Sequence, residues 1–158
     1  MDWSNIELVS NEILAKLPQQ EPFRFLDRII EVDSDHIVGQ YTFRPEADFY
    51  RGHFPGNPVT PGVILLETIA QTAVLAFGIY LGMREHPNDP QFAAERNLFL
   101  FVDCQADFMK SVLPGDTVTI KAEKLFWRRK KLRAKAEMLL STGETAVLAT
   151  VSGLGVSQ

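Results

Sequence analysis

The stretch Gly62–Gly82 constrains the fold more than any other part of the sequence. Pro61 precedes it, its Leu, Ile and Ala content favours a helix, and its apolar side chains project around the whole helix axis. Such a helix must be buried on nearly every side. A membrane span would also bury it, but the first half of the stretch contains the polar residues Glu67, Thr68, Gln71 and Thr72. We therefore expect the core helix of a globular domain.

Several other segments alternate between apolar and polar side chains, with the period of two that is typical of half-buried strands. The alternation is clearest in Thr117–Lys124 and Leu132–Leu140, and a last strand is expected through Ala146–Val151. Weaker signals at Phe23–Val32 and Ile37–Phe43 predict a hairpin. Strands with one apolar face indicate an antiparallel sheet. The simplest arrangement is an α+β fold in which a curved antiparallel sheet wraps around the long helix.

The length of 158 residues and the hydrophobic content of 46% fit a single domain over residues 1–158. The net charge of −4 speaks against a general nucleic-acid-binding protein, because such proteins need excess positive charge to neutralise phosphate. The single cysteine, Cys104, excludes an internal disulfide and fits a reducing compartment.

Residues 1–17 predict a short amphipathic helix, and Ser4 and Glu7 have the spacing of a capping box. The segment has no basic patch followed by an unbroken apolar run, which a secretory signal would need. Its polar face is acidic, which disfavours contact with a membrane. We therefore expect a cytoplasmic protein that does not bind membranes.

The loop Arg51–Gly62, which contains three prolines and three glycines, offers a candidate functional site. These residues predict an irregular but stiff loop, so His53 would be held on a rigid support. The loop ends where the apolar helix begins, at Gly62. Unpaired backbone N–H groups at a helix amino terminus can stabilise a carbonyl oxygen that gains negative charge.

Glu67 lies five residues into the helix, and Gln71 follows one turn later on the same face. Removal from water disfavours the charged form of a carboxyl group, so we expect a raised pKa for Glu67. Such a group can donate a proton near neutral pH, where a histidine can accept one. A base, an acid and an oxyanion-binding backbone together suit proton abstraction next to a carbonyl.

A purely structural role for His53 and Glu67 remains the alternative on these grounds, since isolated histidines in loops are usually solvated or structural. The other histidines, His36 and His86, are expected at the surface. The three histidines and Cys104 do not have the spacing of metal ligands, so no metal site is expected.

Two sequence blocks carry a resemblance to a known family: Gly52-His53-Phe54-Pro55-Gly56-Asn57-Pro58-Val59-Thr60-Pro61-Gly62-Val63 and Leu66-Glu67-Thr68-Ile69-Ala70-Gln71. Together they resemble the active-site signature of the 3-hydroxyacyl-[acyl-carrier-protein] dehydratases of the FabZ type. The likeness extends from Leu17-Pro18 to Pro114-Gly115-Asp116 and covers most of the chain. It implies a hot-dog fold and a site built between two subunits. A homodimer would be the minimal unit, and a hexamer could form as a trimer of dimers.

The resemblance also implies the chemistry. His53 would take the C2 proton of a 3-hydroxyacyl thioester, while Glu67 of the partner subunit would protonate the departing 3-hydroxyl group. Water and a trans-2-enoyl thioester would result, without a metal or redox cofactor. The related dehydratase-isomerases carry Asp at the position of Glu67, so dehydration without isomerisation is expected.

Further positions are assigned by the same resemblance. The Gly62 N–H, with Val63 beside it, would bind the thioester oxygen, and Gln71 would orient the glutamate. Phe99 falls near a position often filled by a tyrosine that gates the acyl tunnel. Thr60 departs from the family, which commonly has a larger apolar residue there.

Positive charge is concentrated in residues 121–135, which contain eight Lys or Arg and one acidic residue. This segment has a net charge of +7, and the rest of the chain carries −11. The run Arg128-Arg129-Lys130-Lys131 lies between two predicted strands, where a bend would expose it. It is either an ordinary solvated hairpin or a surface for an acidic partner. In the family that partner would be acyl carrier protein, whose phosphopantetheine arm delivers the substrate.

Two other functions stay open at this point. One is a hot-dog acyl thioesterase, in which a carboxylate activates water. The other is a non-catalytic acyl-binding subunit of a biosynthetic complex.

Overall fold

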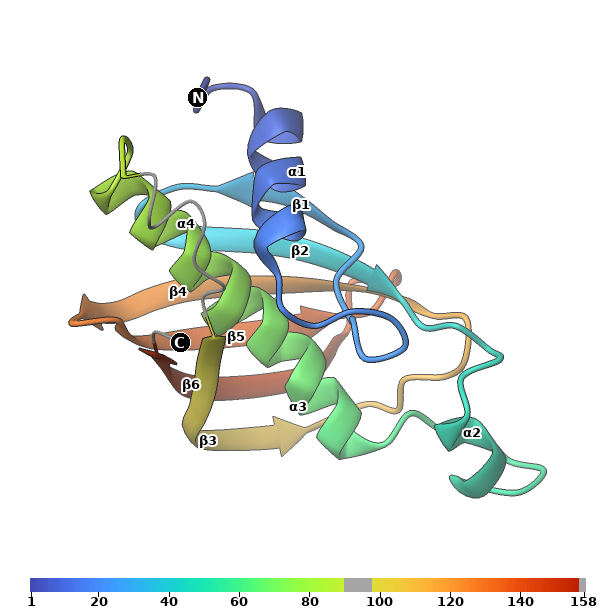
Figure 1. Cartoon of the computed structure of the whole chain (residues 1–158). Coiled ribbons are helices and arrows are strands. Elements are labelled where there is room, and N and C mark those ends of the chain that lie inside the picture. Colours follow the sequence, from blue (N-terminus) through green and yellow to red (C-terminus); the bar gives the residue numbers. More distant parts are fainter. Residues whose placement is uncertain (90–97, 157–158) are drawn as a thin grey trace.

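The computed structural model describes residues 1–89 and 98–156, in which six strands form one antiparallel sheet with a long helix across one face (Figure 1). The spatial order of the strands is β1-β2-β4-β5-β6-β3. The elements are α1 (Ile6–Lys16), β1 (Arg28–Val32), β2 (His36–Thr42), α2 (Phe49–Gly52), α3 (Gly62–Ala70), η1 (Gln71–Ala76), α4 (Phe77–Glu85), β3 (Leu98–Phe108), β4 (Thr117–Arg128), β5 (Lys131–Leu139) and β6 (Thr145–Val156).

The central helix consists of α3, η1 and α4, which follow one another without a break from Gly62 to Glu85. It is long and apolar enough to cross a membrane, but 72% of its most apolar part is buried inside the protein. It is therefore a core helix, as the sequence predicts, and it extends three residues beyond the expected end at Gly82. A long helix enclosed by a curved antiparallel sheet is the hot-dog arrangement.

The middle of this helix, η1, is a π-helical segment that the sequence does not predict. All six of its residues are buried, and it packs against the inner face of the sheet. The approach of the two layers is very close at Gly39 of β2, where an added Cβ would lie 2.9 Å from Cγ2 of Thr72. Glycine at this position allows the helix to pack close against the sheet.

The strand predictions for the last third of the chain are confirmed by β4, β5 and β6, and the predicted hairpin is formed by β1 and β2. β1 begins at Arg28, whereas the sequence predicts a strand from Phe23. Burial alternates regularly in Lys131–Leu139, where every second side chain faces the helix.

β3 is a strand that the sequence analysis does not identify. Among the described strands it pairs only with β6, and it forms one edge of the sheet. A register shift between Phe101 and Asp103 interrupts its alternation. Most of its side chains are exposed, including the apolar residues Leu100, Phe101, Val102 and Phe108. In the described part of the chain, no strand pairs with the outer edge of β3.

α1 confirms the predicted amino-terminal helix but not its cap. Asn5, and not Ser4, caps the helix, because its side chain accepts a hydrogen bond from the Leu8 N–H at 3.2 Å. On its buried side, Ser10 Oγ accepts a hydrogen bond from the Ile29 N–H at 3.0 Å. This bond ties α1 to β1.

Candidate active site

His53 directly follows the short helix α2, in a loop that closes on itself. The Val59 N–H donates to the His53 carbonyl at 2.9 Å, and Nδ1 of the His53 ring lies 2.8 Å from the Val59 carbonyl oxygen. A carbonyl can only accept, so Nδ1 must carry the proton in this bond. In the neutral ring Nε2 therefore keeps its lone pair and can act as a base.

The start of α3 lies in the same region. His53, Thr60 and Gly62 line a cavity of about 350 Å³ together with Phe108 and neighbouring residues. Pro61 caps the helix without a side-chain hydrogen bond, and the first N–H groups of an α-helix have no acceptor within the helix. The ring of Phe108 lies close above the helix start, where an added Cβ on Gly62 would be 3.2 Å from it.

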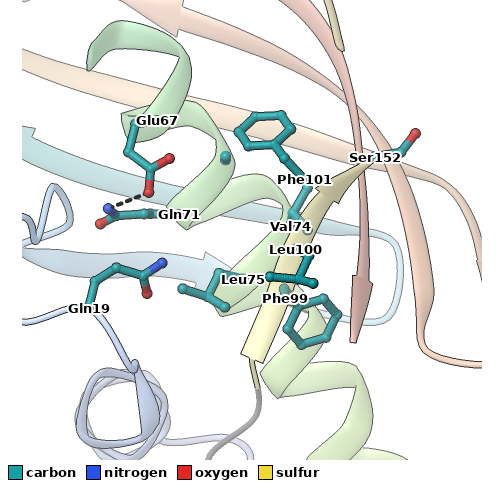
Figure 2. Close-up of a pocket in the computed structure, with 10 residues that line it drawn as sticks. Gln19, Glu67, Gln71, Val74, Leu75, Phe99, Leu100, Phe101 and Ser152 are labelled. Atoms are coloured by element: carbon teal, nitrogen blue, oxygen red, sulfur yellow. Dashed lines mark hydrogen bonds between the residues drawn. The ribbon is translucent and has the colours of Figure 1, made fainter. Parts of the chain in front are cut away.

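Glu67 is held by Gln71 on the next turn of the helix (Figure 2). The Gln71 Nε2 donates to Glu67 Oε1 at 2.9 Å and to the Phe23 carbonyl at 2.9 Å, while its Oε1 accepts from the Phe25 N–H at 2.7 Å. Because the Phe25 N–H can only donate, these contacts fix the orientation of the carboxamide. The Gln71 side chain is only 1% exposed.

Burial raises the pKa of Glu67, as predicted, and the hydrogen bond from Gln71 opposes this shift only in part. The proton is therefore retained to higher pH than on an ordinary glutamate. The arrangement gives a carboxyl group that can act as a proton donor.

Glu67, Gln71 and Phe99 line a second cavity, of about 160 Å³ (Figure 2). Its walls are mostly apolar, with Val74 and Leu75 from the central helix and Leu100 and Phe101 from β3. An added Cβ on Gly78 would overlap the Phe99 ring, so this ring lies directly on the helix backbone. The cavity thus combines mostly apolar walls with the Glu67 carboxyl group.

Two polar residues of this cavity were missed by the sequence analysis. Gln19 lies next to Gln71, and its buried Oε1 has no hydrogen-bond partner in the described part of the chain (Figure 2). Ser152 is fully buried and donates to Asp103 at 3.0 Å. Neither residue belongs to a recognisable motif, and Ser152 is brought to the cavity by the pairing of β6 with the unpredicted strand β3.

The structure brings the predicted site residues together in two groups and not in one. His53 and Gly62 line one cavity, and Glu67, Gln71 and Phe99 line the other. Val63 is 72% exposed and is not among the described residues that line either cavity. Within the described residues of one chain, the histidine and the glutamate line two different cavities.

The predicted basic run forms the bend of a hairpin, as expected. β4 ends at Arg128 and β5 begins at Lys131, while Arg129 and Lys130 have positive φ values of 51° and 59°. The bend lies near the carboxyl end of the central helix, because Trp127 Nε1 donates to Glu85 at 2.7 Å. The His53 loop precedes the other end of that helix (Figure 1).

Comparison with known proteins places this geometry in context. Residues 17–150 match the family model of the FabA-like domain. The 3-hydroxyacyl-[acyl-carrier-protein] dehydratase FabZ of Syntrophobacter fumaroxidans is 35% identical over 144 residues, which cover 89% of this chain and 91% of that protein. The protein of the same name from Chlamydia trachomatis serovar L2 is 39% identical over 114 residues, or 71% of this chain and 69% of that protein.

The chain belongs to the FabA-like family. The matched region of this FabA-like protein contains His53, Glu67, Gln71 and the basic hairpin bend, whereas Ser152 lies beyond it. The family relationship therefore includes the candidate site and not only the scaffold.

Solved structures agree with the fold. A dehydratase heterocomplex, ApeI:P from Xenorhabdus doucetiae, superposes with a TM-score of 0.73 at 16% identity, over 91% of this chain and 90% of that chain. A hypothetical thioesterase with coenzyme A from Streptococcus pneumoniae gives a TM-score of 0.57 at 16% identity, over 82% and 88% of the two chains. At 16% identity, these two structures show only that the FabA-like protein shares their hot-dog fold.

Proposed function

We propose that this protein dehydrates 3-hydroxyacyl chains on acyl carrier protein to the trans-2-enoyl products, as part of fatty-acid or related acyl-chain synthesis. The observation that carries the proposal is the Glu67 carboxyl group, held by Gln71 in a cavity with mostly apolar walls. Burial there raises its pKa, which favours the protonated form that an acid catalyst needs. The relatives named as FabZ dehydratases support the same reaction.

The reaction needs one base and one acid. Nε2 of His53 takes the C2 proton of the thioester, and the electron pair of that C–H bond forms the C2–C3 double bond. The 3-hydroxyl leaves with the proton of Glu67 as water. The Gly62 N–H accommodates the negative charge on the thioester oxygen, a contribution of about 3–4 kcal/mol in other enzymes. No electrons enter or leave, so the reaction requires no redox cofactor.

The thioesterase alternative is less well supported. A carboxylate that activates water must be ionised, whereas the raised pKa of Glu67 favours the neutral form. We expect the purified protein to convert carrier-bound 3-hydroxyacyl thioesters to enoyl thioesters without releasing free thiol. Release of thiol without enoyl product would overturn the proposal. Loss of activity in both His53→Ala and Glu67→Gln would also argue against a non-catalytic acyl-binding subunit.

We infer further that each site combines His53 of one subunit with Glu67 of the partner subunit. Two features support this. The two residues line separate cavities in one chain, and the uncovered edge strand β3 offers a surface for a second copy. Dimers of this kind could assemble further into a trimer of dimers.

A mixed dimer tests the shared site. A His53→Ala chain and a Glu67→Gln chain, carrying different tags, are produced together and the heterodimer is purified. One of its two sites would contain both intact residues, so about half of the wild-type activity is expected. A site confined to one chain would give no activity in this heterodimer. Each variant paired with itself is the control.

The edge strand can be tested separately. Val102→Asp should shift the protein from dimer to monomer in sedimentation, because it introduces a charge into the exposed apolar strand β3. Leu125→Asp is the matched control, since Leu125 is a similarly exposed apolar residue on β4. A Val102→Asp variant that remains a dimer would place the interface elsewhere.

The basic bend at Arg128, Arg129, Lys130 and Lys131 is proposed to attract the acidic carrier protein. Arg129 and Lys130 have positive φ values, which Asn and Gly adopt more easily. The two basic residues therefore give the bend positive charge but make it less stable than Asn and Gly would. The bend lies far from the His53 loop of its own chain, so we propose electrostatic steering and not a contact with the reacting group.

The double variant Arg128→Glu with Lys131→Glu reverses the charge but leaves the turn residues unchanged. KM for a carrier-bound substrate should rise about tenfold at low salt, and the effect should fade at high salt. KM for the same acyl group on a small thiol should not change. Lys135→Glu, on the outer face of β5, is the control. An equal effect on both substrates would contradict a carrier site.

A cytoplasmic location follows from this carrier-dependent chemistry and remains part of the proposal.

A further inference from the structure

Two buried hydroxyl groups form a hydrogen bond next to the His53 loop. Oη of Tyr50 lies 2.6 Å from Oγ1 of Thr60, and the two residues are 5% and 3% exposed. The bond therefore has little competition from water, and neither hydroxyl is left without a partner.

The two hydroxyls stand at the two ends of the loop that contains His53. Tyr50 lies in α2, three residues before the histidine. Thr60 follows Val59, whose carbonyl accepts from Nδ1 of His53 at 2.8 Å. The Thr60 N–H also donates to the Val112 carbonyl at 2.9 Å, which anchors this end of the loop to the segment after β3.

We propose that Tyr50 and Thr60 are positioning residues for the catalytic base: their hydrogen bond holds the Val59 carbonyl against Nδ1 of His53 and thereby keeps Nε2 directed at the substrate. The inference rests on the proposed role of His53. It assigns to Tyr50 and Thr60 no contact with the substrate.

The physical argument concerns what happens when one hydroxyl is removed. The other is then buried without a partner, which is costly, and it moves toward water. In Tyr50→Phe the movement of Thr60 displaces Val59, which is bonded directly to it. In Thr60→Val the movement of Tyr50 displaces α2, which His53 directly follows. The Nδ1–H bond then lengthens and the ring is free to rotate. Small displacements of a reacting group can slow catalysis by about 10²-fold.

Kinetic measurements on four variants test the inference. Thr60→Val keeps the size of the side chain but removes the hydroxyl, and Tyr50→Phe removes the other one. Each should lower kcat about tenfold and leave KM within about twofold, because both side chains are almost fully buried and their hydroxyls bond each other. Thr60→Ser, which keeps the hydroxyl, should retain at least about half of the activity. The double variant should be no slower than either single one, since both break the same bond.

Tyr80→Phe is the matched control, because Tyr80 is a similarly buried tyrosine in α4. It should have wild-type kinetics. The inference is overturned if Thr60→Val keeps the wild-type kcat, if Thr60→Ser is as slow as Thr60→Val, or if the two single losses multiply in the double variant.

A spectroscopic measurement separates this inference from the proposed function. The Nδ1 proton of His53 is assigned by NMR through its loss in His53→Ala, and its exchange with water is measured. Exchange should be at least about tenfold faster in Thr60→Val than in wild type. Unchanged exchange overturns the inference whether or not the enzyme is active. Suppose that exchange is faster in Thr60→Val but the wild-type protein has no dehydratase activity. This result would support the positioning role of Tyr50 and Thr60 and reject the proposed function.

Discussion

The Gln71 carboxamide connects Glu67 to a segment more than 40 residues earlier in the chain. Its Nε2 lies 2.9 Å from Glu67 Oε1, and its other contacts are the Phe23 carbonyl and the Phe25 N–H. Gln71 thus performs two tasks. It holds the Glu67 carboxyl group in place, and it satisfies two backbone groups of the segment that precedes β1.

Replacing Gln71 by Leu should therefore destabilise the protein strongly. The Phe25 N–H and the Phe23 carbonyl would be left unpaired in a buried position, at a cost of about 2–4 kcal/mol in the free energy of unfolding. Urea denaturation measures this change. Gln20→Leu is the control, because Gln20 is exposed, and it should change stability by less than about 0.5 kcal/mol. Equal effects of the two substitutions would show that the buried contacts of Gln71 contribute little.

Glu67→Gln should lose activity but gain stability at neutral pH. The raised pKa means that the folded state holds this proton more tightly than the unfolded state. The free energy of unfolding of the wild type therefore falls as pH rises from the ordinary carboxyl value of 4.5 through the raised value. Glutamine does not titrate, and its Oε1 can still accept from Gln71.

Thermal melts at pH 4 and pH 8 measure this effect. The melting temperature of Glu67→Gln should exceed that of wild type at pH 8, and the difference should disappear near pH 4. Glu46→Gln, at an exposed position, makes the same charge change and should show no such pH dependence. Activity of Glu67→Gln should fall by about 10²- to 10⁴-fold, the usual contribution of a general acid. A variant less stable than wild type at pH 8 would contradict the burial argument.

Phe99→Ala should shift the preference toward longer acyl chains. Its ring lines the Glu67 cavity and lies against Gly78, so its removal opens space along the helix. Each additional buried methylene contributes about 0.8 kcal/mol, or roughly fourfold in kcat/KM. A series of carrier-bound substrates of increasing length measures the shift. Phe126→Ala, at an exposed aromatic residue on β4, should leave the order of preference unchanged.

The basic bend gives a prediction about stability. Arg129 and Lys130 occupy left-handed conformations in a two-residue hairpin bend, for which Asn and Gly are the favoured residues. Arg129→Asn with Lys130→Gly should therefore stabilise the protein by about 1 kcal/mol in urea denaturation. Arg129→Lys with Lys130→Arg keeps both charge and strain and should have no effect. A loss of stability in the first variant would indicate contacts of the two side chains that outweigh the strain.

The sequence predicts the central helix and the strands near the carboxyl end because their periodicity is strong and regular. β3 escapes detection for a specific reason. Its residues 103–108 alternate between polar and apolar, but residues 98–102 form a continuous apolar run, and a register shift lies between Phe101 and Asp103. An alternation that covers only half of a strand gives a weak period-two signal. The predicted strand from Phe23 fails because Phe23 and Phe25 bond to a side chain, Gln71, and not to a neighbouring strand.

The candidate site shows the same division. The local sequence identifies His53, Gly62, Glu67 and Gln71, because each lies a fixed number of residues from the start of the central helix. Residues that reach the site through tertiary packing cannot be recognised in this way. The hydroxyl pair of Tyr50 and Thr60 is an example: Thr60 lies inside the signature block, but nothing in the sequence indicates its bond to Tyr50, and only the folded loop brings the two hydroxyls to 2.6 Å.

The uncovered strand β3 has a consequence for how the protein is made in a cell. A newly synthesised chain that has folded alone presents unpaired backbone groups along eleven residues, next to apolar side chains. Such an edge adds any extended segment it meets, including wrong ones. The proposed pairing of two copies through β3 would remove this hazard, so the yield of native protein is expected to depend on how soon a newly folded chain meets a second copy.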